Sequence, residues 1–449
     1  DMEAKGIRLK TTAWKDDLKK QVENFQPDLI ALSTTEDMWE LGVKILEEIK
    51  DYKVKNKVPT VAGGVFPTFA PEIVIKEPLI DVVCVGEGEN ALRDLCKRIE
   101  NNQDYDDITN CWVKTIGPEY LKNRNVIKKN PIAKPVDMNK NPTIDLSLFE
   151  ENRLYRPMGG KVYKMFPVET HRGCPFTCTY CNSPAQVTLH KEENLGSYFR
   201  RRSIDRIREE LSTLINRWDA EYIYFPADTF LAWKNKEFEE FISMYEEFKL
   251  PFWMQTRPET ITEQKVDQLH SVNCHRVSVG IEHGNEKFRR EVVNRKITND
   301  VLVERTNILG RKIPVSVNNI TGFPTETREL AFDTIKLNRR LEVDTMNCYT
   351  YMPYNGTPLR RLAVSENLLD ENAVTCSLTA GSVLDMPYYP RSEIEKIVKV
   401  FSLYARLPES LWPKIKRAEK NDQTGNELFN ELRETYINKY FNDGIVTFS

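Results

Sequence analysis

The sequence lacks the features that would mark a membrane protein or a protein that coats nucleic acids. It contains no run of about 18 apolar residues, so no membrane span is expected. Lys and Arg number 64 and Asp and Glu number 67, which leaves a formal net charge of −3 and no basic excess to bind nucleic acid. No internal repeat or low-complexity tract is present. Residues 1–6 are neither those of a signal peptide nor a usual start of a chain.

The cysteines do not suggest a disulfide framework. There are nine of them, an odd number, and because reduced thiols fit the cytoplasm we expect a cytoplasmic protein. Cys96 is expected in the core, since cysteine is often buried. The length of 449 residues suggests two or three domains, and a hydrophobic content of 40% is sufficient for real cores.

The first hundred residues alternate strand and helix patterns. Apolar runs at 27–33, 58–62 and 81–85 predict strands, and amphipathic segments that follow each of them predict helices. Repeated strand–helix units predict a parallel sheet with helices on both faces, whose ligands bind beyond the carboxyl ends of the strands. Small or polar residues stand at those three ends, and the alternative is that they only form tight turns. The candidate binding residues are Ser33, Thr34, Thr35, Gly63, Gly64, Val65, Gly86, Glu87 and Gly88.

Three cysteines at spacings of four and three residues form the strongest motif in the chain. Cys174, Cys178 and Cys181 can point inward from one tight loop, and cysteine thiolates are the ligands of iron–sulfur clusters. A cubane cluster held by three thiolates keeps one iron open for another ligand. The alternative is a zinc site completed by His171 or His190.

A second run of strand–helix units surrounds and follows this motif. Strands are expected at residues 162–168, 222–225, 252–257, 276–282, 315–324 and 345–353, which predicts an incomplete six-stranded barrel. Polar residues at strand ends, such as Asp228, Gln255 and Arg257, are candidates for the site. The arginines at 200–202 are expected to form an ion-paired or solvated face rather than an anion site. Beyond residue 365 the chain is expected to be helical, with helices at 393–404, 413–419 and 427–440.

The cysteine motif, preceded by Arg172-Gly173 and containing Pro175-Phe176 and Tyr180, resembles the cluster loop of the radical SAM superfamily. The resemblance implies a [4Fe–4S] cluster on Cys174, Cys178 and Cys181. In that superfamily the open iron chelates S-adenosylmethionine (SAM), and reduction of the cluster releases a 5′-deoxyadenosyl radical.

Later segments resemble other motifs of the same superfamily. Gly280–Glu282 is similar to the fourth-strand motif near the SAM ribose, residues 322–326 to the fifth-strand motif, and residues 351–359 to the sixth-strand end. The resemblance implies SAM-binding roles for Ser278, Glu282, Gly322 and Pro353.

Residues 27–99 resemble the cobalamin-binding domain that precedes many radical SAM barrels. The resemblance places Ser33, Thr34 and Thr35 near the nucleotide tail of cobalamin, with the Gly63–Gly64 pair beside it, and places residues 86–88 beside the corrin. The expected fold is α/β: a Rossmann-like cobalamin-binding domain (1–114) without its first strand, a linker (115–160), a partial (β/α)6 barrel (161–365) and a helical region (366–449). No Asp-x-His-x-x-Gly segment is present, so the lower ligand of cobalt stays open.

These resemblances imply a cobalamin-dependent radical SAM enzyme that methylates an unactivated carbon through the 5′-deoxyadenosyl radical and methylcobalamin. One alternative is a cobalamin-binding radical SAM enzyme that catalyses a rearrangement, cyclisation or desaturation. A tRNA methylthiolase is less expected, because the chain has no additional N-terminal cysteine triad and no basic C-terminal domain. The expected partners are a small-molecule, lipid or peptide substrate and an electron donor such as flavodoxin or ferredoxin.

Overall fold

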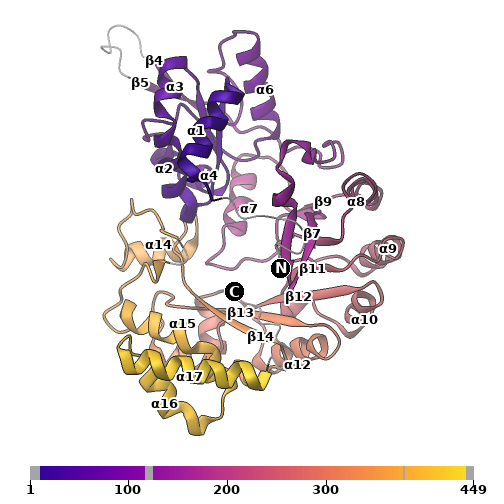
Figure 1. The fold of residues 1–449 in the computed structure, drawn as a ribbon, viewed down its shortest axis with the longest axis vertical. Helices are drawn as coiled ribbons and strands as arrows, with labels where there is room; N and C mark the ends of the chain where they lie inside the picture. Colours follow the sequence, from indigo (N-terminus) through magenta and orange to yellow (C-terminus); the bar gives the residue numbers. More distant parts are fainter. Residues whose placement is uncertain (1–10, 117–124, 378–379, 441–449) are drawn as a thin grey trace.

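The computed structural model describes residues 11–116, 125–377 and 380–440. Figure 1 shows an N-terminal lobe in indigo, a curved sheet with outer helices in magenta to orange, and C-terminal helices in yellow. The predicted α/β fold class is confirmed. In the part of the chain that the structure describes, no helix is long and apolar enough to cross a membrane.

The N-terminal lobe is a five-stranded sheet with the order β1-β2-β3-β4-β5. β1, β2 and β3 are parallel, as predicted. β4 runs antiparallel to β3, and β5 runs antiparallel to β4. Successive residues point to opposite faces, so Ala62 and Val83 pack against α2, α4 and α5, whereas Val61 and Val82 pack against α6. The elements of this lobe are α1 (Trp14–Phe25), β1 (Ile30–Ser33), α2 (Trp39–Glu48), α3 (Lys50–Asn56), β2 (Thr60–Gly63), α4 (Val65–Phe69), α5 (Pro71–Val74), β3 (Val82–Cys84), α6 (Glu89–Glu100), β4 (Cys111–Ile116) and β5 (Asn125–Lys129).

The sequence analysis missed strands in the segment that it assigned to a linker. β5 pairs with β4 in the N-terminal sheet, and β6 (Tyr155–Met158) pairs with β7 (Lys161–Pro167) in the second sheet. Both are short edge strands with several polar residues, so their apolar alternation is weak. The expectation that Cys96 is buried is wrong, because its position on α6 faces solvent.

The second sheet has the order β14-β13-β12-β11-β10-β7-β6. Six of these strands are parallel neighbours, namely β7, β10, β11, β12, β13 and β14, which confirms the predicted incomplete barrel. β6 pairs antiparallel with β7 at one edge. A short ribbon of β8 and β9 lies beside the cysteine loop. The remaining elements are β8 (His171–Arg172), α7 (Ser183–Glu192), β9 (Arg200–Arg201), α8 (Ile204–Trp218), β10 (Tyr222–Phe225), α9 (Asn235–Tyr245), β11 (Phe252–Thr256), α10 (Glu263–Ser271), β12 (Cys274–Glu282), α11 (Glu286–Glu291), α12 (Asn299–Gly310), β13 (Val315–Thr321), α13 (Arg328–Asn338), β14 (Thr345–Thr350) and α14 (Pro358–Ser365).

Hydroxyl N-caps start several of the outer helices. Ser203, as predicted, accepts the N–H of Arg206 at the start of α8, and Thr298 caps α12 in the same way. Each cap satisfies a backbone donor that has no partner within its own helix. The helix boundaries around the barrel are therefore encoded locally.

Three helices complete the chain: α15 (Arg391–Arg406), α16 (Trp412–Ala418) and α17 (Gln423–Tyr440). α15 begins two residues earlier than predicted, after Pro390, and α17 begins before Gly425 rather than after it. α15 packs on β14, where the Ser402 hydroxyl donates to the carbonyl of Met346. The helical region thus shares one hydrophobic core with the barrel.

Candidate cofactor site

A cavity of about 610 Å³ lies at the carboxyl ends of the N-terminal strands, and we call it the sheet cavity. Seven of the nine residues predicted for cobalamin line it: Ser33, Gly63, Gly64, Val65, Gly86, Glu87 and Gly88. Thr34 is not on its wall, because its buried hydroxyl donates to the carbonyl of Thr35. Thr35 lines a second, neighbouring cavity instead.

Two of these glycines are required by the backbone. Gly64 has a φ of +108°, and a Cβ there would lie 2.6 Å from the carbonyl oxygen of Thr34. Gly86 has a φ of +86°, where side chains are disfavoured. The tight turns keep the strand ends open to a bulky ligand, so both the turn and the binding interpretations fit these residues.

Glu87 joins the wall of the sheet cavity to the barrel. Its carboxylate pairs with the guanidinium of Arg172 at 3.0 Å and with that of Arg200, and it accepts the backbone N–H of Val136 at 3.1 Å. Burial alone would raise the pKa of Glu87, but the two guanidiniums outweigh it and hold the pKa below its ordinary value. The residue is therefore an anchored carboxylate.

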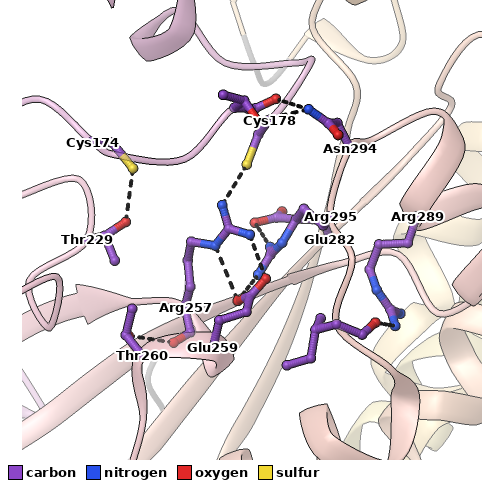
Figure 2. Close-up of polar contacts among 12 residues, drawn as sticks. Cys174, Cys178, Thr229, Arg257, Glu259, Thr260, Glu282, Arg289, Asn294 and Arg295 are labelled. Atoms are coloured by element: carbon purple, nitrogen blue, oxygen red, sulfur yellow. Dashed lines mark hydrogen bonds and ion pairs between the residues drawn. The ribbon is translucent and has the colours of Figure 1, made fainter.

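The cysteine loop runs from β8 to α7, and its three thiols are free. The Cys174 sulfur lies 3.3 Å from the Thr229 hydroxyl, and the Cys178 sulfur accepts a hydrogen bond from Nη1 of Arg257 at 3.0 Å (Figure 2). The Cys181 sulfur accepts the N–H of Ser183 at 3.4 Å. Burial raises the pKa of all three thiols, that of Cys181 to about 12.

These side-chain orientations do not converge on one point. Among the described residues, no group of three or more His, Cys, Asp or Glu side chains is arranged to hold a metal ion. Cys174 is directed toward Thr229 and Cys178 toward Arg257 (Figure 2). The donor set nevertheless fits an iron–sulfur cluster, because three free thiols share one short loop and hydrogen-bond donors lie beside the sulfurs. The assignment of the three cysteines as ligands stays a prediction.

The two histidines considered for a zinc site have other surroundings. His171 contacts the Thr170 hydroxyl at 3.1 Å and lies edge-on to Trp233, and burial lowers its pKa to about 4. The ring of His190 packs against that of Tyr198 at 5.0 Å. Neither histidine forms a metal-binding group with the cysteines in the described part of the chain.

A buried chain of charges lies beneath the cysteine loop. Arg257 pairs with Glu259 at 2.5 Å, Arg295 bridges Glu259 and Glu282 at 3.1 Å each, and so the chain runs from Cys178 to Glu282 (Figure 2). Glu282 has a φ of +66° at a register shift in β12, which turns its carboxylate toward Arg295. The sequence analysis named Arg257 and Glu282 but missed the residues that connect them.

The other residues predicted for SAM are held by protein groups. Ser278 accepts the indole N–H of Trp253 at 2.9 Å. The N–H of Gly322 donates to Glu326 at 2.6 Å, and the carbonyl of Pro353 accepts a guanidinium N–H at 2.7 Å. None of these residues, nor Glu282, lines the sheet cavity or its neighbour, so their roles toward SAM stay predictions.

The neighbouring cavity, which we call the loop cavity, has a volume of about 360 Å³. It lies between the cysteine loop and the N-terminal lobe and shares Val65, Gln186 and Tyr198 with the sheet cavity. Asp228, at the end of β10, is also on its wall, and burial together with the nearby charge of Glu169 raises the pKa of this carboxyl. The two cavities therefore meet at a common wall.

A buried carboxylate that the sequence analysis missed joins the two lobes beside the loop cavity. Glu36, 4% exposed, accepts the backbone N–H of Asn355 at 2.7 Å, its side-chain amide at 2.9 Å and the backbone N–H of Thr375 at 2.9 Å. Arg360 lies 3.5 Å away. No local pattern marks this residue, because its partners lie more than 300 positions away in the chain.

Comparisons with known proteins agree with this arrangement. The radical SAM superfamily profile matches residues 168–337, and the B12 binding domain profile matches residues 3–96. An uncharacterized methyltransferase of Pyrococcus horikoshii is 27% identical over 398 residues, which cover 87% of this chain and 81% of that protein. The anaerobic magnesium-protoporphyrin IX monomethyl ester cyclase of Rubrivivax gelatinosus is 24% identical over 347 residues, 76% of this chain but only 59% of the cyclase.

Solved structures that resemble nearly the whole chain include the following one. It is the cobalamin-dependent S-adenosylmethionine radical enzyme OxsB with aqua-cobalamin and S-adenosylmethionine bound, with a TM-score of 0.64 and 15% identity. The match covers 95% of this chain and 65% of that one. At this identity the likeness supports the fold.

Proposed function

Because the chain is a radical SAM protein with a B12 binding domain, we propose that it methylates an unactivated carbon of its substrate. Such a carbon has no lone pair, so polar attack on SAM fails and radical chemistry is required. The first relative described above carries the name methyltransferase, which favours this reaction over other radical chemistry.

The single observation that carries the proposal is the common wall of the two cavities. Strand ends of the N-terminal lobe line one, the cysteine loop lines the other, and Val65, Gln186 and Tyr198 face both. A corrin on the first side and SAM on the second would lie next to each other. Methyl transfer to a carbon radical needs that proximity, because the reacting groups must approach directly.

When bound, the [4Fe–4S] cluster, SAM and cobalamin supply the radical chemistry and the methyl group. The protein holds and orients these groups. Cys174, Cys178 and Cys181 would hold the iron, and the N–H that Arg257 places on the Cys178 sulfur would tune the cluster electrostatically. Glycine turns at Gly64 and Gly86 leave space for the corrin.

The walls of the loop cavity would shield part of a bound substrate from water. Phe66, Tyr180, Tyr198 and Tyr354 contribute aromatic surface there, and Asp228 offers a carboxylate for a polar group of SAM or substrate. Exclusion of water protects reactive species from side reactions. The reaction belongs in the cytoplasm, with a reductant such as flavodoxin or ferredoxin and a small-molecule, lipid or peptide substrate.

Two measurements test the proposal. Anaerobic reconstitution with iron, sulfide and hydroxocobalamin should give the absorption and EPR signals of both cofactors. With candidate substrates and SAM that carries a deuterated methyl group, the product mass should rise by one labelled methyl. A product formed without that label would instead support cyclisation, rearrangement or desaturation, which the named cyclase relative makes the second candidate.

Replacement of Cys174, Cys178 and Cys181 by Ala provides the decisive control. The triple variant should still bind cobalamin, because none of the three cysteines lines the sheet cavity. It should lose the cluster signal. Full activity in this variant would contradict the proposal.

A further inference from the structure

The β8–β9 ribbon brings two arginines to one carboxylate of the other lobe. Arg172 on β8 is the register partner of Arg200 on β9, so the two guanidiniums lie side by side. Both pair with Glu87, which lines the sheet cavity. Arg172 also pairs with Glu89 at 2.8 Å and with Glu169 at 2.9 Å. The arginines at 200–202 are ion-paired, as expected, and each of them pairs with a glutamate.

Only Gly173 separates Arg172 from Cys174, the first cysteine of the loop. Gly173 has a φ of +92°, and a Cβ there would lie 2.8 Å from the ring of Tyr198. Tyr198 faces both cavities. The position of Cys174 is therefore linked through Gly173 to Arg172, and through Arg172 to the wall of the sheet cavity.

We propose that Glu87, Arg172 and Arg200 form a clamp that couples cobalamin binding to cluster binding. These three are positioning residues, since they act through the cavity wall and the cysteine loop. The inference rests on the proposed cofactors, and it adds that each cofactor raises the affinity of the protein for the other.

The physical argument is thermodynamic linkage through one interface. A cluster would fix the cysteine loop and with it Arg172, whereas cobalamin would fix the wall that carries Glu87. Each ligand then reduces the conformational freedom that the other must still restrict. Coupling between binding sites is reciprocal and commonly amounts to about 5- to 150-fold in affinity.

The contacts of the clamp are partly shielded from solvent. The Glu87 side chain is 14% exposed, and those of Arg172 and Arg200 are 23% and 18% exposed, so solvent screens the contact less than a surface pair. Removal of Arg172 would leave Glu87 with Arg200 and the N–H of Val136 as partners, so the carboxylate would lose one of its two charged contacts to the ribbon.

The experiment measures the dissociation constant of hydroxocobalamin anaerobically, by absorbance after equilibrium dialysis, with and without the reconstituted cluster. In the unmodified protein the cluster should tighten binding at least about five-fold. In Arg172→Gln, cobalamin should still bind, but the ratio of the two constants should fall to about one. Arg172→Lys, which keeps the charge, should restore part of the ratio.

Arg201→Gln is the matched control. Arg201 is the next residue on the same ribbon, but its guanidinium pairs with Glu237 of α9, within the barrel. This variant should keep the ratio of the unmodified protein. A ratio of about one in the unmodified protein, an unchanged ratio in Arg172→Gln, or an equal loss in Arg201→Gln would each overturn the clamp.

A double-mutant cycle separates the clamp from a general effect on folding. Glu87→Gln and Arg172→Gln should each lower the ratio, and the double variant should lower it no further. Additive losses would refute the pairing. If the unmodified protein binds no cobalamin at all, the proposed function itself fails and the clamp fails with it, whereas binding without coupling contradicts the clamp alone.

Discussion

Glu36 offers the sharpest test of how the two lobes are held together. Its carboxylate accepts three N–H groups, two from Asn355 and one from Thr375, at 2.7 to 2.9 Å, and all three donors belong to the segment that follows β14. Glu36→Ala removes the acceptor and leaves two backbone donors without a partner. It also leaves the Arg360 guanidinium, which is 3.5 Å away and largely buried, without its counter-charge.

The expected cost follows from these contacts. Hydrogen bonds to a charged group contribute about 1.5–3 kcal/mol each. Removal of the carboxylate also removes the free-energy cost of burying it. The net loss of stability is therefore smaller than the sum of the three hydrogen-bond contributions. Removal of one member of a buried ion pair costs about 3–5 kcal/mol, and we expect Glu36→Ala to lower the free energy of unfolding by that amount.

The assay is urea unfolding followed by tryptophan fluorescence, since Trp39 lies in the core of the N-terminal lobe. Glu40→Ala, on the exposed side of the adjoining helix, is the matched control and should change stability by less than about 0.5 kcal/mol. A loss below about 1 kcal/mol in Glu36→Ala would refute the reasoning, because the contacts would then contribute no more than an exposed pair.

Three further predictions concern the cofactor site. Gly64→Ala should weaken cobalamin binding at least about ten-fold by equilibrium dialysis, because its Cβ would lie 2.6 Å from a backbone oxygen, and unchanged binding would contradict the need for this turn. Arg257→Lys should shift the cluster reduction potential measured by EPR-monitored titration, since the hydrogen bond to the Cys178 sulfur is lost, and an unchanged potential would contradict that role. Burial would raise the pKa of Glu259, but the flanking guanidiniums outweigh it and lower the pKa to about 2. Ionised Glu259 therefore stabilises the fold by about 3 kcal/mol above its ordinary pKa of about 4.3. This stabilisation is lost as the pH falls toward 2. Acid unfolding of the cluster-free protein should show this loss and Glu259→Gln should lack it; equal acid sensitivity would argue against the pair.

The strand ends could be predicted because their signals are local. An apolar run followed by Gly63–Gly64 or by Gly86 specifies a strand and its turn within a few residues, and the turns then meet at one cavity. The six strands of the barrel were found in the same way. Thr34 departs from the pattern, since its hydroxyl turns back to the neighbouring carbonyl.

Charged contacts between distant segments could not be predicted in this way. Arg295 reaches Glu259 across 36 positions, and Glu36 reaches Asn355 across 319. Charged residues are common on surfaces, so nothing in the local sequence distinguishes these buried ones. The pairing appears only once the barrel strands bring the segments together.

The wall shared by the two cavities has a consequence for the order in which molecules enter. Tyr198 lines both the sheet cavity and the loop cavity, so occupants of the two would meet at its ring. A bulky occupant of the smaller chamber, at about 360 Å³, would therefore obstruct later entry of a large planar ring system into its neighbour. Filling the sheet cavity before the loop cavity would avoid this obstruction.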